Sequence, residues 1–239
     1  MIPGAIEMMD NLAIQAAEPM AHAGFPMDAG AALLVELDGS ERECDARFQE
    51  VEHFCKEAGA TEVRVAGDEA ERQRFWKARK AAFASMGRIA HAYYVQDGVI
   101  PRTRLPEVLG RISELSEEYG LRVANVFHAG DGNLHPLVCY DSPEQAERAA
   151  ELSERILDAC LELGGSITGE HGVGADKKKH MGKQFAEPDL AAFQKLRCAF
   201  DPHALANPGK VMPTPRLCGE VPGPYRRHPL EEAGLAERF

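Results

Sequence analysis

Residues 128 to 135 read HAGDGNLH, with one histidine before a glycine-rich turn and one after it. Side chains alternate along a strand, so His128 at the end of one strand and His135 at the start of the next can project to the same face. Gly130 and Gly132 permit the positive φ angles that a tight turn needs. The pattern therefore predicts a β-hairpin that brings two imidazoles close together.

A metal site built on two histidines lacks at least one ligand, and a carboxylate from a second loop is a natural supplier. The glycine-dense stretch GGSITGEHGVGADKKK, residues 164–179, carries Glu170 followed directly by His171. Neighbours in an extended loop point in different directions, so Glu170 can bind a metal while His171 faces a substrate. The spacing favours a divalent-metal site over isolated surface histidines, although glycines in both loops are also typical of tight turns.

The elements that must position these residues follow from the apolar periodicity of the chain. Helices are predicted over 5–21, from the capping box SERE at 40–43 to Gly59, from Asp68 to about Met86, from Thr103 to Gly120, from Ser142 to Gly164, and from 175 to about Phe200. Strands are predicted over 31–37, 62–66, 92–96, 123–128 and 134–140. Strands that alternate with helices but include a direct hairpin predict an α+β fold of ferredoxin-like type, with an antiparallel or mixed sheet and helices packed on one face.

Composition narrows the class of protein. The 239 residues are 44% hydrophobic and carry a formal net charge of −11, which allows a substantial core and argues against binding to nucleic acid. No apolar stretch is long enough to span a bilayer and the N-terminus lacks the pattern of a signal peptide, so we expect a cytoplasmic protein without direct membrane insertion. The 6 cysteines are scattered singly, which predicts neither a zinc knuckle nor an iron–sulfur cluster, and Cys44, Cys55 and Cys160 are expected to be buried small hydrophobes.

The motifs HAGDGNLHP, GGSITGEHGVG, DPHALANPGKVMP and YYVQDGVIPRTRLPEVL resemble the C-terminal domain of the FAD-linked oxidases related to vanillyl-alcohol oxidase. The resemblance runs from about Ile2 to Cys218 in family order, and is greatest to the FAD-linked D subunits of glycolate oxidase (glycolate dehydrogenase). It implies oxidation of a 2-hydroxy acid, glycolate or D-lactate, to the 2-oxo acid by hydride transfer to FAD. It also implies partner subunits, including an iron–sulfur electron-transfer subunit, that can bring a cytoplasmic protein to a membrane.

The resemblance assigns roles to the residues of the two loops. His128, His135 and Glu170 match the family's ligands for a divalent metal, which is zinc, manganese or iron. His171 matches the catalytic base. These roles agree with elementary chemistry, because a metal chelated by the carboxylate and hydroxyl of a 2-hydroxy acid lowers the pKa of the hydroxyl, and a nearby imidazole can accept its proton.

Other matches concern the substrate and the cofactor. Arg79, in FWKAR, matches an arginine that binds the substrate carboxylate. Asn207 and Lys210, in NPGK, match the stretch that returns toward the flavin and are the candidate cofactor-binding residues. Val95 stands where relatives that accept dicarboxylates often carry a lysine, which favours a small monocarboxylate as substrate.

The resemblance further implies that FAD is held chiefly by an N-terminal domain of about 200 residues, and this chain begins where such a domain would end. No GxGxxG fingerprint occurs. The expected organisation is a helical connector over 1–30, a substrate and metal domain over 31–213, and a proline-rich, partly disordered tail over 214–239, and the isolated chain is expected to bind little FAD and to have no turnover. Two alternatives stay open, namely a metal-dependent hydrolase that uses His171 as base, and a non-catalytic fragment or assembly domain.

Overall fold

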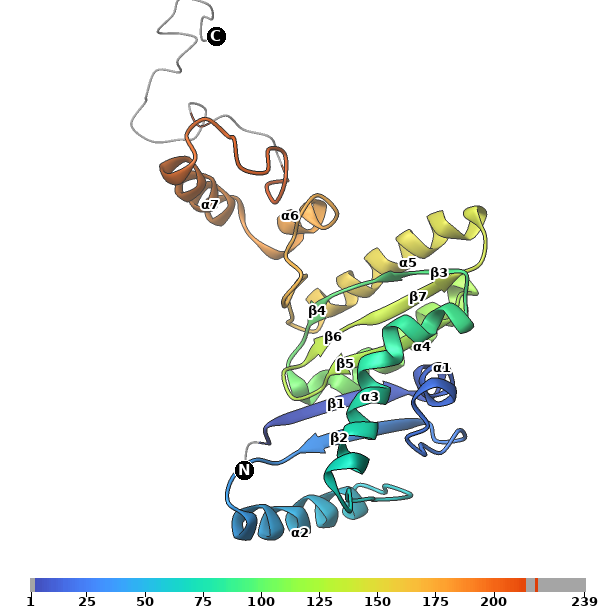
Figure 1. Cartoon of the computed structure of the whole chain (residues 1–239). Helices are drawn as coiled ribbons and strands as arrows, with labels where there is room; N and C mark the ends of the chain where they lie inside the picture. Colours follow the sequence, from blue (N-terminus) through green and yellow to red (C-terminus); the bar gives the residue numbers. More distant parts are fainter. Residues whose placement is uncertain (1–2, 214–217, 219–239) are drawn as a thin grey trace, which may run out of the picture. The chain divides into compact units, whose positions relative to one another are not determined.

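A computed structural model describes residues 3–213 and residue 218 (Figure 1). The chain forms two compact units, Met1–Gly169 and Glu170–Phe239. The boundary at Gly169 falls inside the range 31–213 that the sequence predicts as one substrate and metal domain. The predicted tail over 214–239 lies outside the described residues apart from Cys218. None of the described helices is both long and apolar enough to cross a membrane.

A seven-stranded antiparallel sheet forms the centre of the first unit, where the blue β1 lies between β2 and β5 (Figure 1). The strands are β1 (Ala5–Asp10), β2 (Ala31–Glu36), β3 (Ala92–Val95), β4 (Gly98–Val99), β5 (Val123–His128), β6 (Asn133–Leu134) and β7 (Pro136–Tyr140). Beyond β5 the sheet continues through β6 to β4 and through β7 to β3. The predicted hairpin of β5 with β6 and β7 is confirmed, and so is the α+β class with an antiparallel sheet.

The helices of the first unit are α1 (Asn11–Ala21), α2 (Glu41–Glu57), α3 (Glu69–Ser85), α4 (Leu105–Tyr119) and α5 (Pro143–Glu162), with short 3-10 turns η1 (Met86–Arg88) and η2 (Arg102–Arg104). The second unit contains η3 (Lys178–His180), α6 (Met181–Gln184) and α7 (Glu187–Phe200). The predicted capping box is present at the start of α2, where Ser40 and Glu43 bond to each other's backbone N–H.

Helices cover both faces of the sheet, so the expectation of helices on one face is wrong. Val126 of β5 belongs to a buried cluster with Ile14 of α1 and Ala82 of α3. The next residue, Phe127, belongs to a second cluster that includes residues of α4 and α5. Neighbouring strand residues point to opposite faces, and both are apolar here. A strand that is apolar on both sides, such as VANVFH or PLVCY, is buried on both sides.

Residues 5–21 are not one helix, contrary to the prediction. Residues 5–10 form β1, and α1 begins only after Asp10, whose carboxylate caps the helix by accepting from the N–H of Ala13 at 2.9 Å. The pairing of β1 with both β2 and β5 outweighs the local helical periodicity, because each residue of a central strand gains partners on two sides. This stretch is therefore a sheet strand and not part of a helical connector.

The strand predicted over residues 62–66 is also absent from the described first unit. The segment has no regular secondary structure, and Arg64 within it donates to the carbonyls of Gly24 and Ala23 at 2.9 and 2.6 Å. Val65 is 51% exposed, so the apolar alternation of EVRVA does not correspond to a buried face. Cys160 is buried as predicted, whereas Cys44 and Cys55 are only half-buried, because α2 contributes no fully buried residue.

Candidate functional site

One face of the sheet changes from apolar to polar along its strands. Four apolar residues pack in or against the core cluster beneath α1 and α3, and each has a polar residue two positions away along the chain. The pairs are Met9 with Glu7, Val126 with His128, Leu137 with His135, and Val95 with Asp97. The period-two alternation of strands puts such pairs on the same face. Glu7 lies opposite His128 across β1 and β5, and Val95 lies opposite Leu137 across β3 and β7. Two histidines and two carboxylates thus gather at one end of one face.

The two imidazoles of the hairpin lie together. The ring centroids of His128 and His135 are 5.3 Å apart and the ring planes are nearly perpendicular, at 84°. His135 is buried, with the ring of Phe83 from α3 at 6.0 Å from its own, while the His128 side chain is 35% exposed. The proximity that the turn predicts is confirmed, and one of the two rings is accessible.

The turn between the histidines depends on one of its glycines. Gly132 has φ +72°, and a Cβ there would lie 2.2 Å from the carbonyl oxygen of Ile100, so no side chain fits. Gly130 is not in the positive-φ region, contrary to the expectation, and its N–H donates to the carbonyl of Ile6 at 2.9 Å. The hairpin is therefore anchored to β1 through Gly130 and to the residue after β4 through Gly132.

Glu7 connects His128 to Arg79. One carboxylate oxygen of Glu7 lies 2.8 Å from Nδ1 of His128. The other accepts from Nε of Arg79 at 3.0 Å and forms an ion pair with Nη2 of the same residue at 2.8 Å. Glu7 and Arg79 are 7% and 6% exposed, so this chain of contacts is almost wholly removed from water. Glu7 is not among the site residues predicted from the sequence, although an acid within the otherwise apolar run AIEMM is a usable signal.

Asp97 connects His135 to the segment that precedes Glu170. Its side chain is fully buried, with Oδ1 3.7 Å from Nε2 of His135. Its other oxygen accepts from the hydroxyl of Thr168 at 2.6 Å and from the N–H of Gly169 at 3.0 Å. A Cβ on Gly169 would lie 2.7 Å from side-chain atoms of Asn133. The backbone next to Glu170 is thereby held close to the sheet, and only glycine fits there.

Glu170 and His171 begin the second unit. Both side chains are about half exposed, at 51% and 48%, and Nε2 of His171 lies 3.9 Å from Oε1 of Glu170. The predicted site residues are thus divided along the chain. His128, His135 and Arg79 lie in the first unit, whereas Glu170, His171, Asn207 and Lys210 lie in the second.

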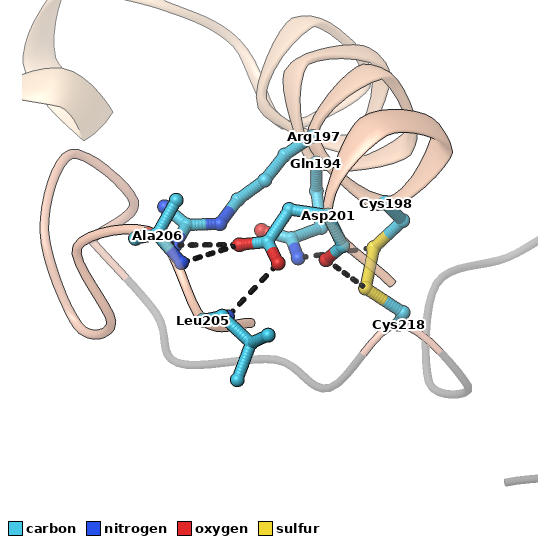
Figure 2. Close-up of a disulfide and its surroundings, with 7 residues drawn as sticks. All are labelled: Gln194, Arg197, Cys198, Asp201, Leu205, Ala206 and Cys218. Atoms are coloured by element: carbon cyan, nitrogen blue, oxygen red, sulfur yellow. Dashed lines mark hydrogen bonds and ion pairs between the residues drawn. A yellow bond between two sulfur atoms is a disulfide. The ribbon is translucent and has the colours of Figure 1, made fainter. Parts of the chain in front are cut away.

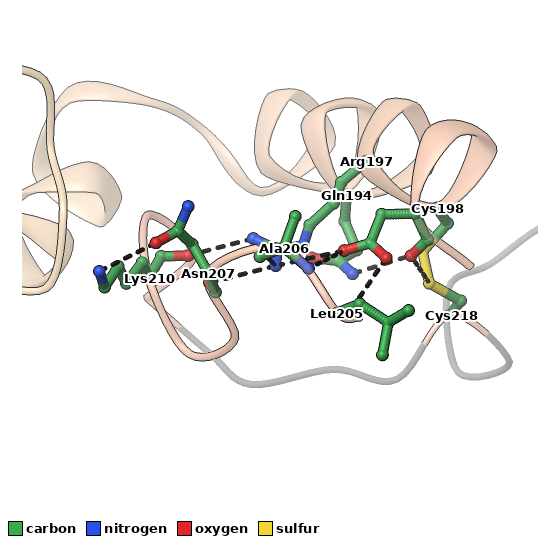
Figure 3. A network of polar contacts seen from close by, with 9 residues as sticks. Gln194, Arg197, Cys198, Leu205, Ala206, Asn207, Lys210 and Cys218 are labelled. Atoms are coloured by element: carbon green, nitrogen blue, oxygen red, sulfur yellow. Dashed lines mark hydrogen bonds and ion pairs between the residues drawn. A yellow bond between two sulfur atoms is a disulfide. The ribbon is translucent and has the colours of Figure 1, made fainter. Parts of the chain in front are cut away.

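The NPGK segment follows α7 in the second unit (Figure 3). Asn207 has φ +47°, and its side-chain carbonyl accepts from Nζ of Lys210 at 3.0 Å. Arg197 of α7 donates to the backbone carbonyls of Ala206 and Asn207, the latter at 3.2 Å. The two candidate cofactor-binding residues therefore contact each other within a loop that an arginine holds against the helix.

A disulfide that the sequence analysis missed lies beside this loop. Cys198 at the end of α7 is bonded to Cys218, with Cα atoms 5.4 Å apart (Figure 2). Asp201 lies between them along the chain, and its carboxylate accepts from the N–H groups of Leu205 and Ala206, both at 2.9 Å. The two cysteines are 20 positions apart, and such a separation carries no pairing signal by itself.

A cavity of about 560 Å³ lies elsewhere in the first unit, between α2, β2 and the start of α3. Apolar side chains such as Phe48, Val51 and Phe75 line it. It contains none of the predicted site residues, so the candidate site is the polar end of the sheet and not this cavity.

Comparison with known proteins adds to this geometry. Residues 1–211 match the model of the family described as FAD linked oxidases, C-terminal domain. The chain is 52% identical over 240 residues to glycolate oxidase subunit GlcD of Escherichia coli (strain K12), covering 100% of this chain and 48% of that protein. It is 32% identical over 217 residues to a D-lactate dehydrogenase of Archaeoglobus fulgidus, covering 89% and 46%. The chain thus spans about half the length of the curated relatives it matches.

Similarity of fold extends further than similarity of sequence. The structure of 4-ethylphenol oxidase from Gulosibacter chungangensis, an isoeugenol complex, superimposes with a TM-score of 0.63 at 12% identity. The superposition covers 89% of this chain and 48% of that one. At this identity the likeness concerns the fold alone.

Proposed function

Because this chain belongs to the FAD linked oxidase C-terminal domain family, we propose that it is the substrate- and metal-binding domain of an FAD-dependent 2-hydroxy acid dehydrogenase. The proposed reaction oxidises glycolate or D-lactate to the 2-oxo acid. Similarity to proteins named glycolate oxidase subunit and D-lactate dehydrogenase supports this substrate class. The observation that carries the proposal is the pair of imidazoles, 5.3 Å apart, on the polar end of the sheet.

The donor set fits a divalent metal. Imidazole nitrogens and a carboxylate oxygen are ligands that zinc accepts with an open position for substrate, and manganese and iron accept them as well. We propose His128, His135 and Glu170 as these ligands. The anchoring of Gly169 by Asp97 supports the role of Glu170, because it restrains the backbone of the adjacent residue. A bound metal would supply a Lewis acid that lowers the pKa of the substrate hydroxyl.

The protein's own side chains then have separate tasks. His171 accepts the proton of the substrate hydroxyl. Arg79 binds the substrate carboxylate; its guanidinium has five N–H donors, of which Nε–H donates to Glu7. Asn207 and Lys210 would help to hold the flavin, which when bound would supply the hydride acceptor and would be held chiefly by another domain. Each of these assignments is part of the proposal.

A small monocarboxylate is the proposed substrate. Val95, two residues before Asp97, packs against the apolar cluster beneath α1 and α3, so this position offers no cation to a second carboxylate. Since the E. coli relative is named a subunit, we also propose partner subunits, including an iron–sulfur subunit that accepts the electrons.

The test uses the enzyme assembled from this chain and its FAD-binding domain, with anaerobic bleaching of the flavin as the readout. Glycolate and D-lactate are expected to bleach it, and D-2-hydroxyglutarate to do so much more slowly. A clear preference for D-2-hydroxyglutarate would refute the substrate class. Hydrolysis of an ester without flavin reduction would favour the metal-dependent hydrolase instead.

A further inference from the structure

A buried carboxylate lies between the exposed edge of the candidate site and the helix behind it. Glu7 is 7% exposed and contacts His128 through one oxygen and Arg79 through the other. Neither the proposed chemistry nor the family comparison uses it. A buried charge is costly unless it is paired, so a glutamate in the middle of a core strand requires a reason.

We propose that Glu7 is a positioning residue that fixes the orientation and tautomer of His128, so that Nε2 of this imidazole is presented to the metal. The inference rests on the proposed function, since it assumes that His128 is a ligand. It assigns to Glu7 no contact with substrate or cofactor. It predicts an effect on metal affinity that can be measured without any turnover.

The chemistry of the contact determines the tautomer. A neutral imidazole has one N–H donor and one acceptor nitrogen, whereas an ionised carboxylate only accepts. In the proposed arrangement the Glu7 carboxylate accepts across the 2.8 Å contact with Nδ1 of His128, so the proton lies on Nδ1. Nε2 then carries the lone pair, which is the form that a metal ligand needs. Carboxylates that accept from the far nitrogen of a ligand histidine typically raise metal affinity in this way.

Arg79 completes the arrangement by compensating the charge of Glu7. Its Nε donates to one oxygen of Glu7, its Nη2 forms an ion pair with the same oxygen, and the other oxygen of Glu7 contacts His128. The helix that carries Arg79 is closely packed, because its neighbours Ala78 and Ala82 are both 0% exposed. The packing of α3 thus fixes the guanidinium of Arg79, and this guanidinium in turn fixes the carboxylate of Glu7.

The test measures the Zn²⁺ affinity of the full chain by competition with a chromophoric chelator. Glu7→Gln is expected to weaken binding by about 10- to 100-fold, the usual effect of removing such a partner. Asp10→Asn is the matched control, because Asp10 is a half-buried β1 carboxylate that also bonds to β5, through Asn125 rather than through a histidine. It is expected to leave Zn²⁺ affinity unchanged. His128→Ala serves as the positive control for the site itself.

A second readout keeps the test valid if Glu7→Gln folds poorly beside the buried Arg79. Glu7→Asp retains the negative charge but withdraws the carboxylate from His128 by about one C–C bond, about 1.5 Å. Nitrogen NMR of ¹⁵N-histidine-labelled protein without metal reports the tautomer directly. The wild-type protein is expected to show His128 protonated at Nδ1, and Glu7→Asp to show a mixture of tautomers.

The outcomes distinguish the role of Glu7 from the existence of the metal site. If His128→Ala weakens Zn²⁺ binding but neither Glu7 variant does, the role of Glu7 is refuted while the metal site stands. If His128→Ala has no effect, the metal site itself is refuted. Equal weakening by Glu7→Gln and Asp10→Asn would show a general loss of structure and would also overturn the inference.

Discussion

Gly169 can approach the sheet closely only because it has no side chain. A Cβ there would lie 2.7 Å from the side chains of Asn133 and Val99. We predict that Gly169→Ala lowers the free energy of unfolding by about 1–3 kcal/mol, the usual cost of overpacking. Urea denaturation measures this, with Gly110→Ala as the control. Gly110 lies in α4 with no atom near its Cβ position, so its replacement is expected to stabilise by about 1 kcal/mol.

The four cysteines outside the disulfide are expected to differ in reactivity, because their burial differs. Burial raises the pKa of the Cys139 thiol to about 11, so this thiol stays protonated at about pH 8. Cys160 is fully buried, whereas Cys44 and Cys55 are half-buried. Alkylation with iodoacetamide followed by mass spectrometry should modify Cys44 and Cys55 first. Rapid labelling of Cys139 in the folded protein would contradict the packing around β7.

Among the elements, the loop after α7 has a pH-dependent anchor. The N–H groups of Ala206 and Leu205 donate to Asp201 and hold its pKa below the ordinary value. A carboxyl whose pKa is lowered by folding stabilises the folded form above its unfolded pKa of about 3.9, and this contribution is lost as the pH falls toward the lowered value. Hydrogen exchange should therefore show protection of these two amides at about pH 6 that declines below about pH 4.

The control for this loop is Asp201→Asn, which cannot ionise. Its amides are expected to show weaker protection at neutral pH and no decline with acid. Equal protection of Leu205 and Ala206 across the whole range in the wild-type protein would show that the carboxylate does not anchor the loop.

For the whole molecule, the location of the core predicts which part folds alone. The three buried clusters lie entirely within the first unit. A fragment of residues 1–169 is therefore expected to unfold in a single cooperative thermal transition. A broad, non-cooperative transition of the fragment, measured by circular dichroism, would show that the second unit is required for this core.

Metal linkage gives a second prediction for the whole molecule. Zn²⁺ at about 100 times its dissociation constant should stabilise the full chain by about 2.7 kcal/mol. The midpoint temperature of its thermal unfolding should rise by several degrees. The fragment 1–169 lacks Glu170, the proposed third ligand, and should gain much less. If calorimetry showed that Zn²⁺ raises the unfolding midpoint of the full chain and of the fragment equally, Glu170 would not be a ligand.

Local patterns determined much of this protein from the sequence alone. The approach of His128 to His135 follows from strand alternation and a short turn, so residues seven apart could be placed without a tertiary structure. The strands of the hairpin and the long helices follow from apolar periodicity for the same reason. The motifs of the two loops and the NPGK segment also led to the family.

Pairings between distant residues were decided only by the tertiary structure. Residues 5–10 have the apolar pattern of a helix, and their strand conformation comes from β2 on one side and β5 on the other. The same pairing brings Glu7 to His128, 121 positions away, and α3 brings Arg79 to Glu7. Local periodicity cannot specify such contacts, because the partner of a strand or of a buried charge depends on how the whole sheet is assembled.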